Sequence, residues 1–412
     1  MFDWFTGMTP LERRTFWASF GGWALDAMDV QIYALVVPAL IAGWHLTSAE
    51  VGQLGAAALF TSALGGWLAG LLSDRVGRVR MLQISVLWFA FFTFLSAFAQ
   101  DFGQLFVLRL LQGFGFGGEW AAGAVLMGEV VEARHRGKAV GCVQAGWAVG
   151  WAVAVLVSGV VFTILPPHLA WRALFMTGIL PALLVFFVRR FVPEPQIFSE
   201  TRKLARERGE AGFLTIFGPE VRRATVLSAL LATGAQGGYH AITTFLPNYL
   251  KSERHLSVLS THAYLAVIVA GSFLGYVVSA YLADAIGRRR NFVLFAVASV
   301  VTVLVYMFLA IGDAAMLILG FPLGFFASGI FSGMGPFLTE IYPSRMRGSG
   351  QGFCYNFGRA AGALFPWLVG LLERRLGLGP AIGVFAVAAY GVMALAALAL
   401  PETKGKQLQA YR

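Results

Sequence analysis

The chain has 412 residues, of which 58% are hydrophobic and only 13% are charged. This composition is typical of an integral membrane protein and excludes a soluble multidomain enzyme. The net charge of +10 would suit a nucleic-acid partner, but the basic residues lie mostly in loops between apolar segments, the pattern that orients a protein in a membrane. We therefore expect contact with the lipid bilayer and none with nucleic acid.

A helix needs about 20 apolar residues to cross a bilayer, and twelve segments of the chain meet that need. They are residues 17–41, 50–73, 81–99, 103–127, 139–163, 170–188, 224–247, 259–283, 291–311, 314–338, 349–372 and 379–400. The short alternating runs of a membrane β-barrel do not occur in the sequence. The sequence thus predicts an all-α membrane protein with twelve transmembrane helices.

The basic residues also predict the orientation of these spans. If the N-terminus is cytoplasmic, most lysines and arginines lie on the cytoplasmic side, including those of 75–80, 134–138, 189–223 and 288–290. The even number of spans then puts the C-terminus on the same side. The first span is too long for a cleavable signal and lacks its small-residue cleavage site. We expect a multi-pass protein of a bacterial inner membrane with both termini in the cytoplasm.

In the first span, Asp26, Asp29 and Tyr33 recur at the spacing of one helix face. Two carboxylates one turn apart repel each other, and burial adds to the preference for a neutral form of one of them. A proton carrier needs that property, although the pair would also serve to hold neighbouring helices together. We rank Asp29 first and Asp26 second as proton carriers, and we expect Tyr33 at the substrate.

Four side chains of the fourth span, Arg109, Gln112, Phe116 and Glu119, share one helix face. A charge facing lipid would cost several kcal/mol, so this face is expected to point into the bundle or a wet cavity. The glycines between them should let neighbouring helices approach closely. Arg109 and Glu119 are about ten residues, or ~15 Å of helix rise, apart, so Glu119 must find a partner on another helix or stay protonated. Arg109 is predicted at the substrate and Glu119 is the third candidate proton carrier; a purely structural pair is the alternative.

Polar side chains also mark the fifth and seventh spans. Gln144 precedes Trp147 by one turn, an amide followed by a flat wall suited to an organic ligand. Gln236, Tyr239 and His240 form a polar stripe in the seventh span. We expect Gln144, Gln236 and Tyr239 to line the substrate site. His240 would relay protons, or it is only a satisfied hydrogen-bonding residue.

The eleventh span contains Tyr355, Asn356 and Arg359. Arg359 is the second cation within the membrane, and its planar fork suits a carboxylate. No acid lies near it in its own span. We predict that Arg359 binds the substrate carboxylate directly, assisted by Gln144, Tyr355 and Asn356. The alternative is a structural pair with an acid of the first or fourth span.

Two charged motifs occur twice in the chain. The sequence around Asp74 and Arg78 recurs around Asp284, and the sequence from Glu129 recurs from Glu340 at nearly the same offset. Two motifs repeated at one offset indicate an internal duplication of six spans each. We expect six-helix bundles at residues 1–190 and 222–412, related by an axis along the membrane normal, with a cytoplasmic linker at 191–221. Residues 199–208 would form a basic amphipathic helix on the membrane surface or a solvated tether.

The repeated charges suggest a gate on the cytoplasmic side. Asp74 would lie at the negative, C-terminal end of its own helix, an unfavourable place for an anion. It is better placed against the N-terminus of the eleventh span, which begins near Gly348. We predict that the repeated charges close this side when the site faces outward and separate when it faces inward. The gate residues are Asp74, Arg78, Glu129, Asp284, Arg288 and Glu340.

GLLSDRVGRVR at 70–80, its echo YLADAIGRRR at 281–290 and the paired Glu…Arg-x-Arg-Gly loops resemble the signature of the major facilitator superfamily. The resemblance runs from about Trp17 to Glu402 and implies a secondary transporter that works by alternating access. LDAMDVQIY, GGEW and YNFGRAAGALFP resemble the proton-coupled organic-acid symporters within it, which include carriers of aromatic acids and sialic acid. Ala27 stands where the aromatic-acid branch has glycine, and the extra spans of the sialate carriers are missing.

The predicted function is therefore proton-coupled symport of a small organic anion by a monomer, with protons and the acid as partners. A uniporter, a drug/proton antiporter and a non-transporting sensor of the same fold are the alternatives. A nucleotide-binding GxxxxGK[ST] loop does not occur. We expect no enzymatic activity, catalytic residue, metal or cofactor.

Overall fold

A computed structural model describes residues 3–46, 48–183, 192–195, 197, 198, 200, 214–255 and 258–408. This part of the chain is almost entirely helical and contains no strand. Eight of its helices are long and apolar enough to cross a membrane. All twelve predicted spans coincide with helix, the sixth as far as residue 183. Within the predicted linker, most of residues 199–208 lie outside the described residues.

The helices fall into an N-terminal and a C-terminal half. The N-terminal half contains α1 (Asp3–Thr6), α2 (Pro10–Trp44), α3 (Ser48–Val76), α4 (Arg78–Ser96), α5 (Phe102–Val130), α6 (Arg136–Val143), α7 (Gly146–Ile164) and α8 (Pro167–Met176). The C-terminal half contains α11 (Arg222–Ser252), α12 (Val258–Ile286), α13 (Arg288–Phe308), α14 (Asp313–Ile341), α15 (Arg347–Gly362), α16 (Leu364–Leu376) and α17 (Leu378–Ala399). Predicted span five is thus α6 with α7, and span eleven is α15 with α16.

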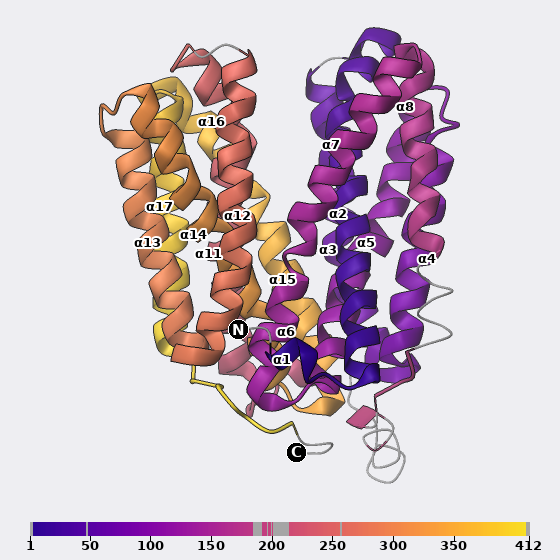
Figure 1. Cartoon of the computed structure of the whole chain (residues 1–412), viewed down its shortest axis with the longest axis vertical. Coiled ribbons are helices and arrows are strands. Elements are labelled where there is room, and N and C mark those ends of the chain that lie inside the picture. The colour runs from indigo at the N-terminus through magenta and orange to yellow at the C-terminus, as the bar shows by residue number, and fades with distance from the viewer. Residues whose placement is uncertain are drawn as a thin grey trace.

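The two halves stand side by side and meet at one end (Figure 1). Both chain termini lie at this end, which we call the base, together with α1 and α6. Toward the opposite end, the rim, the two sets of helices diverge. Contacts between the halves run from α15 to α3 and α5, and from α12 and α14 to α6. These helices therefore form the interface between the two halves.

Matching turns at the base show the internal duplication in the backbone. Gly77 begins α4 with a φ of 125°, and Gly287 begins α13 with a φ of 100°, values that favour glycine. At each turn, the first N–H groups of the helix have no partner within the helix, and a glutamate carboxylate accepts hydrogen bonds from them. Glu194 accepts from the backbone of Arg78 at 2.9 Å, and Glu402 accepts from the backbone of Arg288 at 2.8 Å.

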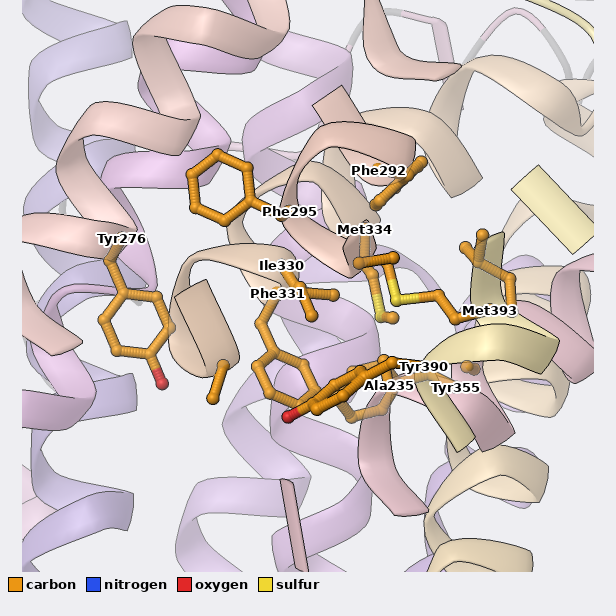
Figure 2. Close-up of a cluster of buried hydrophobic side chains, with 14 of the residues drawn as sticks. Ala235, Tyr276, Phe292, Phe295, Ile330, Phe331, Met334, Tyr355, Tyr390 and Met393 are labelled. Carbon is orange, nitrogen blue, oxygen red and sulfur yellow. The ribbon is translucent and has the colours of Figure 1, made fainter. Parts of the chain in front are cut away.

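The core of the C-terminal half is built from aromatic and sulfur-containing side chains, as Figure 2 shows for residues of α11 to α15 and α17. Tyr276, Phe331 and Tyr355 belong to this cluster and also line the cavity described below. The rigid core of one half therefore supplies part of the wall of the site.

The glycines of the fourth span have the packing role expected for them. A Cβ added at Gly117 would lie 1.8 Å from the carbonyl oxygen of Ser62 and 2.6 Å from the backbone nitrogen of Gly66, both on α3. Small residues let transmembrane helices approach this closely. The glycine-rich stretch thus fixes the position of α5, which carries Phe116 and Glu119.

We expect Gly117→Ala to destabilise the protein, because α3 and α5 would have to separate. Overpacking of this kind costs about 1–3 kcal/mol. The measurement is the melting temperature of the purified protein in detergent. Gly159→Ala is the control, since a Cβ there meets nothing within 4 Å, and it should leave the melting temperature unchanged. Equal melting temperatures for both variants would contradict the packing role.

Candidate functional site

A cavity of about 190 Å³ lies between the two halves. The N-terminal half contributes α2, α3, α5, α7 and the turn before α7, and the C-terminal half contributes α11, α12, α14 and α15. The lining residues are Trp23, Val30, Leu59, Phe116, Gln144, Trp147, Gln236, Tyr239, His240, Tyr276, Phe331, Tyr355 and Arg359. We call it the central cavity.

Arg359 is a buried cation at the wall of this cavity. Its guanidinium lies over the rings of Phe116 and Tyr355, at 4.7 and 5.1 Å from the ring centres. It donates to the Ser62 hydroxyl at 3.3 Å. Within the described part of the chain, no carboxylate lies at ion-pair distance from it. The guanidinium therefore keeps most of its hydrogen-bonding capacity for another partner.

Flat side chains form most of the remaining wall. Trp23 and Trp147 pack against each other with ring centres 4.9 Å apart. Near the cavity, Trp120 of α5 stacks on Tyr355 of α15, with ring centres 3.5 Å apart and an angle of 14°. This stack joins the two halves beside Arg359. The cavity thus combines one cation with broad aromatic surfaces, an arrangement that suits a planar anion.

Five of the eight residues predicted at the substrate line the central cavity: Gln144, Gln236, Tyr239, Tyr355 and Arg359. His240, predicted as a proton relay, lines it as well. Asn356 does not, because it faces α3, where a Cβ added at Gly66 would collide with its amide. Tyr33 and Arg109 are also absent from the lining.

Arg109 belongs to a separate polar network inside the N-terminal half. Its guanidinium donates to Gln112 at 2.7 Å and lies 4.1 Å from the ring centre of Tyr33. The Gln112 amide donates to Asp29, and the Thr93 hydroxyl donates to the same carboxylate at 3.0 Å. Asp29 is therefore fully buried with donors already in place. The helix face predicted for the fourth span is real, but its N-terminal part turns toward α2 and α4 instead of the central cavity.

Asp26 and Glu119 form a second buried acidic group. The two side chains interact directly across α2 and α5. Among the described residues, neither carboxyl group receives a hydrogen bond from a donor. The group that Glu119 meets on another helix is thus a second acid, and no salt bridge joins Glu119 to a cation in the described part of the chain.

Sequence reasoning missed Trp23, Tyr276 and Phe331 as wall residues. Trp23 lies one turn before Asp26 on the same helix, and that spacing was available as a signal. Tyr276 and Phe331 reach the cavity from α12 and α14, whose sequences around these two residues are mostly apolar and give no clear preferred face.

At the base, carboxylates of each half accept hydrogen bonds from helix N-termini of the other. Asp74 accepts from the backbone N–H groups of Gly348 and Ser349 at 3.0 and 2.8 Å. Asp284 accepts from the backbone of Gly137 at 2.9 Å, at the start of α6. The contact predicted between Asp74 and the N-terminus of the eleventh span is therefore present, and the duplicated motif makes it twice.

Ion pairs accompany these carboxylates, with a glutamate in each set held between arginines of both halves. The pairs are Arg78–Glu129 (3.3 Å), Arg347–Glu129, Arg288–Glu340 (2.8 Å) and Arg136–Glu340 (3.2 Å). Arg78 and Arg288 also pair with the aspartate near the end of the preceding helix, at 2.9 and 2.7 Å. These contacts bind the halves together at the base, so this structure is closed on that side.

The family model described as Major Facilitator Superfamily matches residues 20–313 and 229–410. The chain is 44% identical over 405 residues to a probable 4-methylmuconolactone transporter of Cupriavidus pinatubonensis, covering 98% of this chain and 94% of the relative. It is 31% identical to a cis,cis-muconate transport protein of Acinetobacter baylyi, covering 86% of each. The structure of the proton:xylose symporter XylE bound to a bromodeoxyglucose matches with a TM-score of 0.83 at 20% identity, over 97% of this chain and 98% of that one.

We expect Asp74→Asn to weaken the closed base. The amide keeps the shape but loses the charge that accepts from the start of α15, and hydrogen bonds to charged groups contribute about 1.5–3 kcal/mol. A cysteine at Val140 reports the change, because this side chain is buried on α6 and a Cβ added at Gly335 of α14 would lie 2.7 Å from it. With Cys142 and Cys354 replaced by alanine, maleimide labelling of Val140→Cys should accelerate roughly tenfold or more.

The control for this experiment is Asp101→Asn. Asp101 caps α5 within its own half, accepting from the Gln104 backbone at 2.8 Å, so its loss should leave the labelling rate unchanged. An Asp74→Asn protein that labels at the parent rate would show that this contact does not hold the base closed.

Proposed function

The chain belongs to the Major Facilitator Superfamily, and from that premise we propose that it carries a small organic acid, as the carboxylate, together with protons. Its relatives are named as transporters, and the fold is that of a transporter, so it is not an enzyme. In this proposal, the substrate is a carboxylate, the proton gradient drives its transport, and separate residues bind the substrate and the proton.

The observation that carries the proposal is the guanidinium of Arg359 in the central cavity, which forms no ion pair with any described residue. Burying a cation without a partner is expensive, and such residues within membrane spans mark substrate or ion pathways. An arginine fork binds a carboxylate through two parallel hydrogen bonds. A bound carboxylate would supply the negative charge that pairs with Arg359.

The size and walls of the cavity narrow the class of acid. Its volume of about 190 Å³ is below the range of about 300–1,000 Å³ typical of pockets for drug-sized ligands. Trp23, Phe116, Trp147 and Tyr355 offer flat faces to a conjugated ring or chain. The names of the relatives support a small carboxylic acid, since cis,cis-muconate is a conjugated dicarboxylate and 4-methylmuconolactone is a lactone that carries one carboxyl group. Polar groups of the acid other than the carboxylate bound to Arg359 would form hydrogen bonds with Gln144, Gln236 and Tyr239.

Proton coupling is supported by the buried acids near Arg359. Asp26, Asp29 and Glu119 are the candidates, and His240 lines the same cavity as the cation. Asp26 lies close enough to Arg359 for an electrostatic attraction. A substrate carboxylate at Arg359 would compete with Asp26 for that charge and favour uptake of a proton by the acid. Substrate and proton would then move together.

The contacts at the base support alternating access. If the base is cytoplasmic, as the basic residues indicate, the structure corresponds to an outward-facing state of a bacterial inner-membrane protein with both termini inside. Opening would break the Asp74 and Asp284 caps and the ion pairs of Glu129 and Glu340 that cross between the halves. The charged residues at the base would thus act as the cytoplasmic gate.

Three alternatives make different predictions. A uniporter or an antiporter of this fold would not use an inward proton gradient to accumulate the acid. A drug/proton antiporter would favour lipophilic cations, which Arg359 repels. A sensor would bind the acid without moving it across the membrane.

We expect Arg359→Ala to bind cis,cis-muconate at least ~30-fold more weakly, because loss of a desolvated charged contact costs about 2–5 kcal/mol. Arg359→Lys keeps the charge but loses the fork, and should also be impaired. The measurement is counterflow of labelled acids from a panel of carboxylates in proteoliposomes. Arg374→Ala, at an exposed position of α16, is the control and should transport normally. Normal affinity in Arg359→Ala would remove Arg359 from the substrate site.

A further inference from the structure

A second, smaller cavity of about 20 Å³ adjoins the central cavity. Trp23 and Gln144 line both spaces. The other walls of the small cavity come from α2, α4, α5 and α6, and they include Ser19, Glu119, Trp120, Gly123 and Val140. We call it the relay cavity. Val140 belongs to the buried contact between α6 and α14, so this cavity lies between the central cavity and the base.

Four polar side chains of this lining make no hydrogen bond in the described part of the chain. The Ser19 hydroxyl, the indole N–H groups of Trp23 and Trp120, and both carboxyl oxygens of Glu119 are buried without a hydrogen bond. More than nine in ten buried polar groups in proteins are bonded to protein or to ordered water. Four unpartnered groups around one small space therefore indicate a bound molecule.

The polar groups that line the relay cavity suit a water molecule better than a metal cation. A cavity of about 10–15 Å³ holds one water molecule when two to four polar groups surround it. The two indole N–H groups are donors and would repel a cation, whereas a water accepts from them and donates to the Glu119 carboxylate. The hydroxyl of Ser19 fits either role.

Glu119 connects this space to Asp26. Asp26 is fully buried and Glu119 nearly so, and two carboxylates in contact away from water cannot both remain charged. A single proton between them would satisfy both. The other charged groups that act on Asp26 are Asp29 on its own helix and Arg359 on α15. Asp29 differs, because Gln112 and Thr93 already donate to it.

We propose that Asp26 and Glu119 share a proton and that a water in the relay cavity is the route by which a further proton joins and leaves the pair. Uptake turns the singly charged pair into two neutral acids. On release, the Glu119 O–H bond breaks, its electron pair stays on the carboxylate, and the water accepts the proton. This inference rests on the proposed function, and it places coupling at Asp26 and Glu119 instead of at Asp29, the first-ranked residue from sequence.

Infrared difference spectroscopy of the purified protein in lipid tests the pair without any substrate. Raising the pH should remove a carboxylic-acid carbonyl band from the wild-type spectrum. Asp26→Asn and Glu119→Gln should each remove the same component of that change, and Asp29→Asn should leave that component in place. A wild-type protein without the band, or a band lost only in Asp29→Asn, would overturn the assignment.

Gly123→Ala tests the water while leaving every carboxyl group in place. The added Cβ would lie 3.9 Å from the Ser19 hydroxyl and 4.0 Å from Leu82, so it fills the relay cavity without a clash. In proteoliposomes, accumulation of cis,cis-muconate driven by an acidic exterior should fall to the level seen without a gradient, while counterflow stays normal. Gly159→Ala should behave as wild type.

The outcomes separate this inference from the proposed function. If wild type accumulates muconate with the gradient and Gly123→Ala accumulates it equally, the relay water is wrong and proton-coupled transport stands. If wild type moves none of the tested carboxylates, the proposed function fails, and the infrared result alone decides whether the proton pair exists.

Discussion

The free-energy penalty for burying an unpaired charge in an apolar helix bundle is the constraint on which this structure depends. Most of the buried charges at the base offset this penalty by forming ion pairs, as Arg78 does with Asp74 and Glu129. Inside the bundle, Asp29 meets it through Gln112 and Thr93. Arg359 lines the central cavity without an ion pair among the described residues, and the carboxyl groups of Asp26 and Glu119 accept no hydrogen bond there. Asp26 and Arg359 lie close enough to attract each other. Charges that the fold leaves uncompensated are the ones available to a substrate anion and a proton.

The repeated parts at the base provide contacts that the proposed alternation between two states would break and re-form. Each half supplies the same parts at the base: a glycine turn, an aspartate that caps a helix of the other half, and a glutamate between two arginines. Contacts made by caps and ion pairs can break and re-form without repacking a core, unlike the aromatic cluster inside the C-terminal half. The rigid halves and the reversible contacts between them are therefore physically distinct, which is what alternation between two states requires.

The sequence was sufficient for the features that depend on one helix or on the repeat. Span positions follow from hydropathy, and the Asp74 cap follows from the helix dipole and the repeated motif. It was insufficient where several helices meet. Helix periodicity put Arg109 and Glu119 on one face, yet α2 and α4 enclose Arg109 in a network of its own, while Glu119 meets Asp26. Tyr276 and Phe331 had no clear sequence signal, because the stretches of α12 and α14 around them are mostly apolar.

Simultaneous measurement of acid and proton fluxes tests the central claim most directly. Proteoliposomes loaded with a pH-sensitive dye, at equal pH on both sides, would receive labelled cis,cis-muconate from outside. The account predicts that muconate entry acidifies the interior, and that protein-free liposomes and the Arg359→Ala protein show neither change. Muconate entry with no change of internal pH would contradict it, because the acid would then move without its proton.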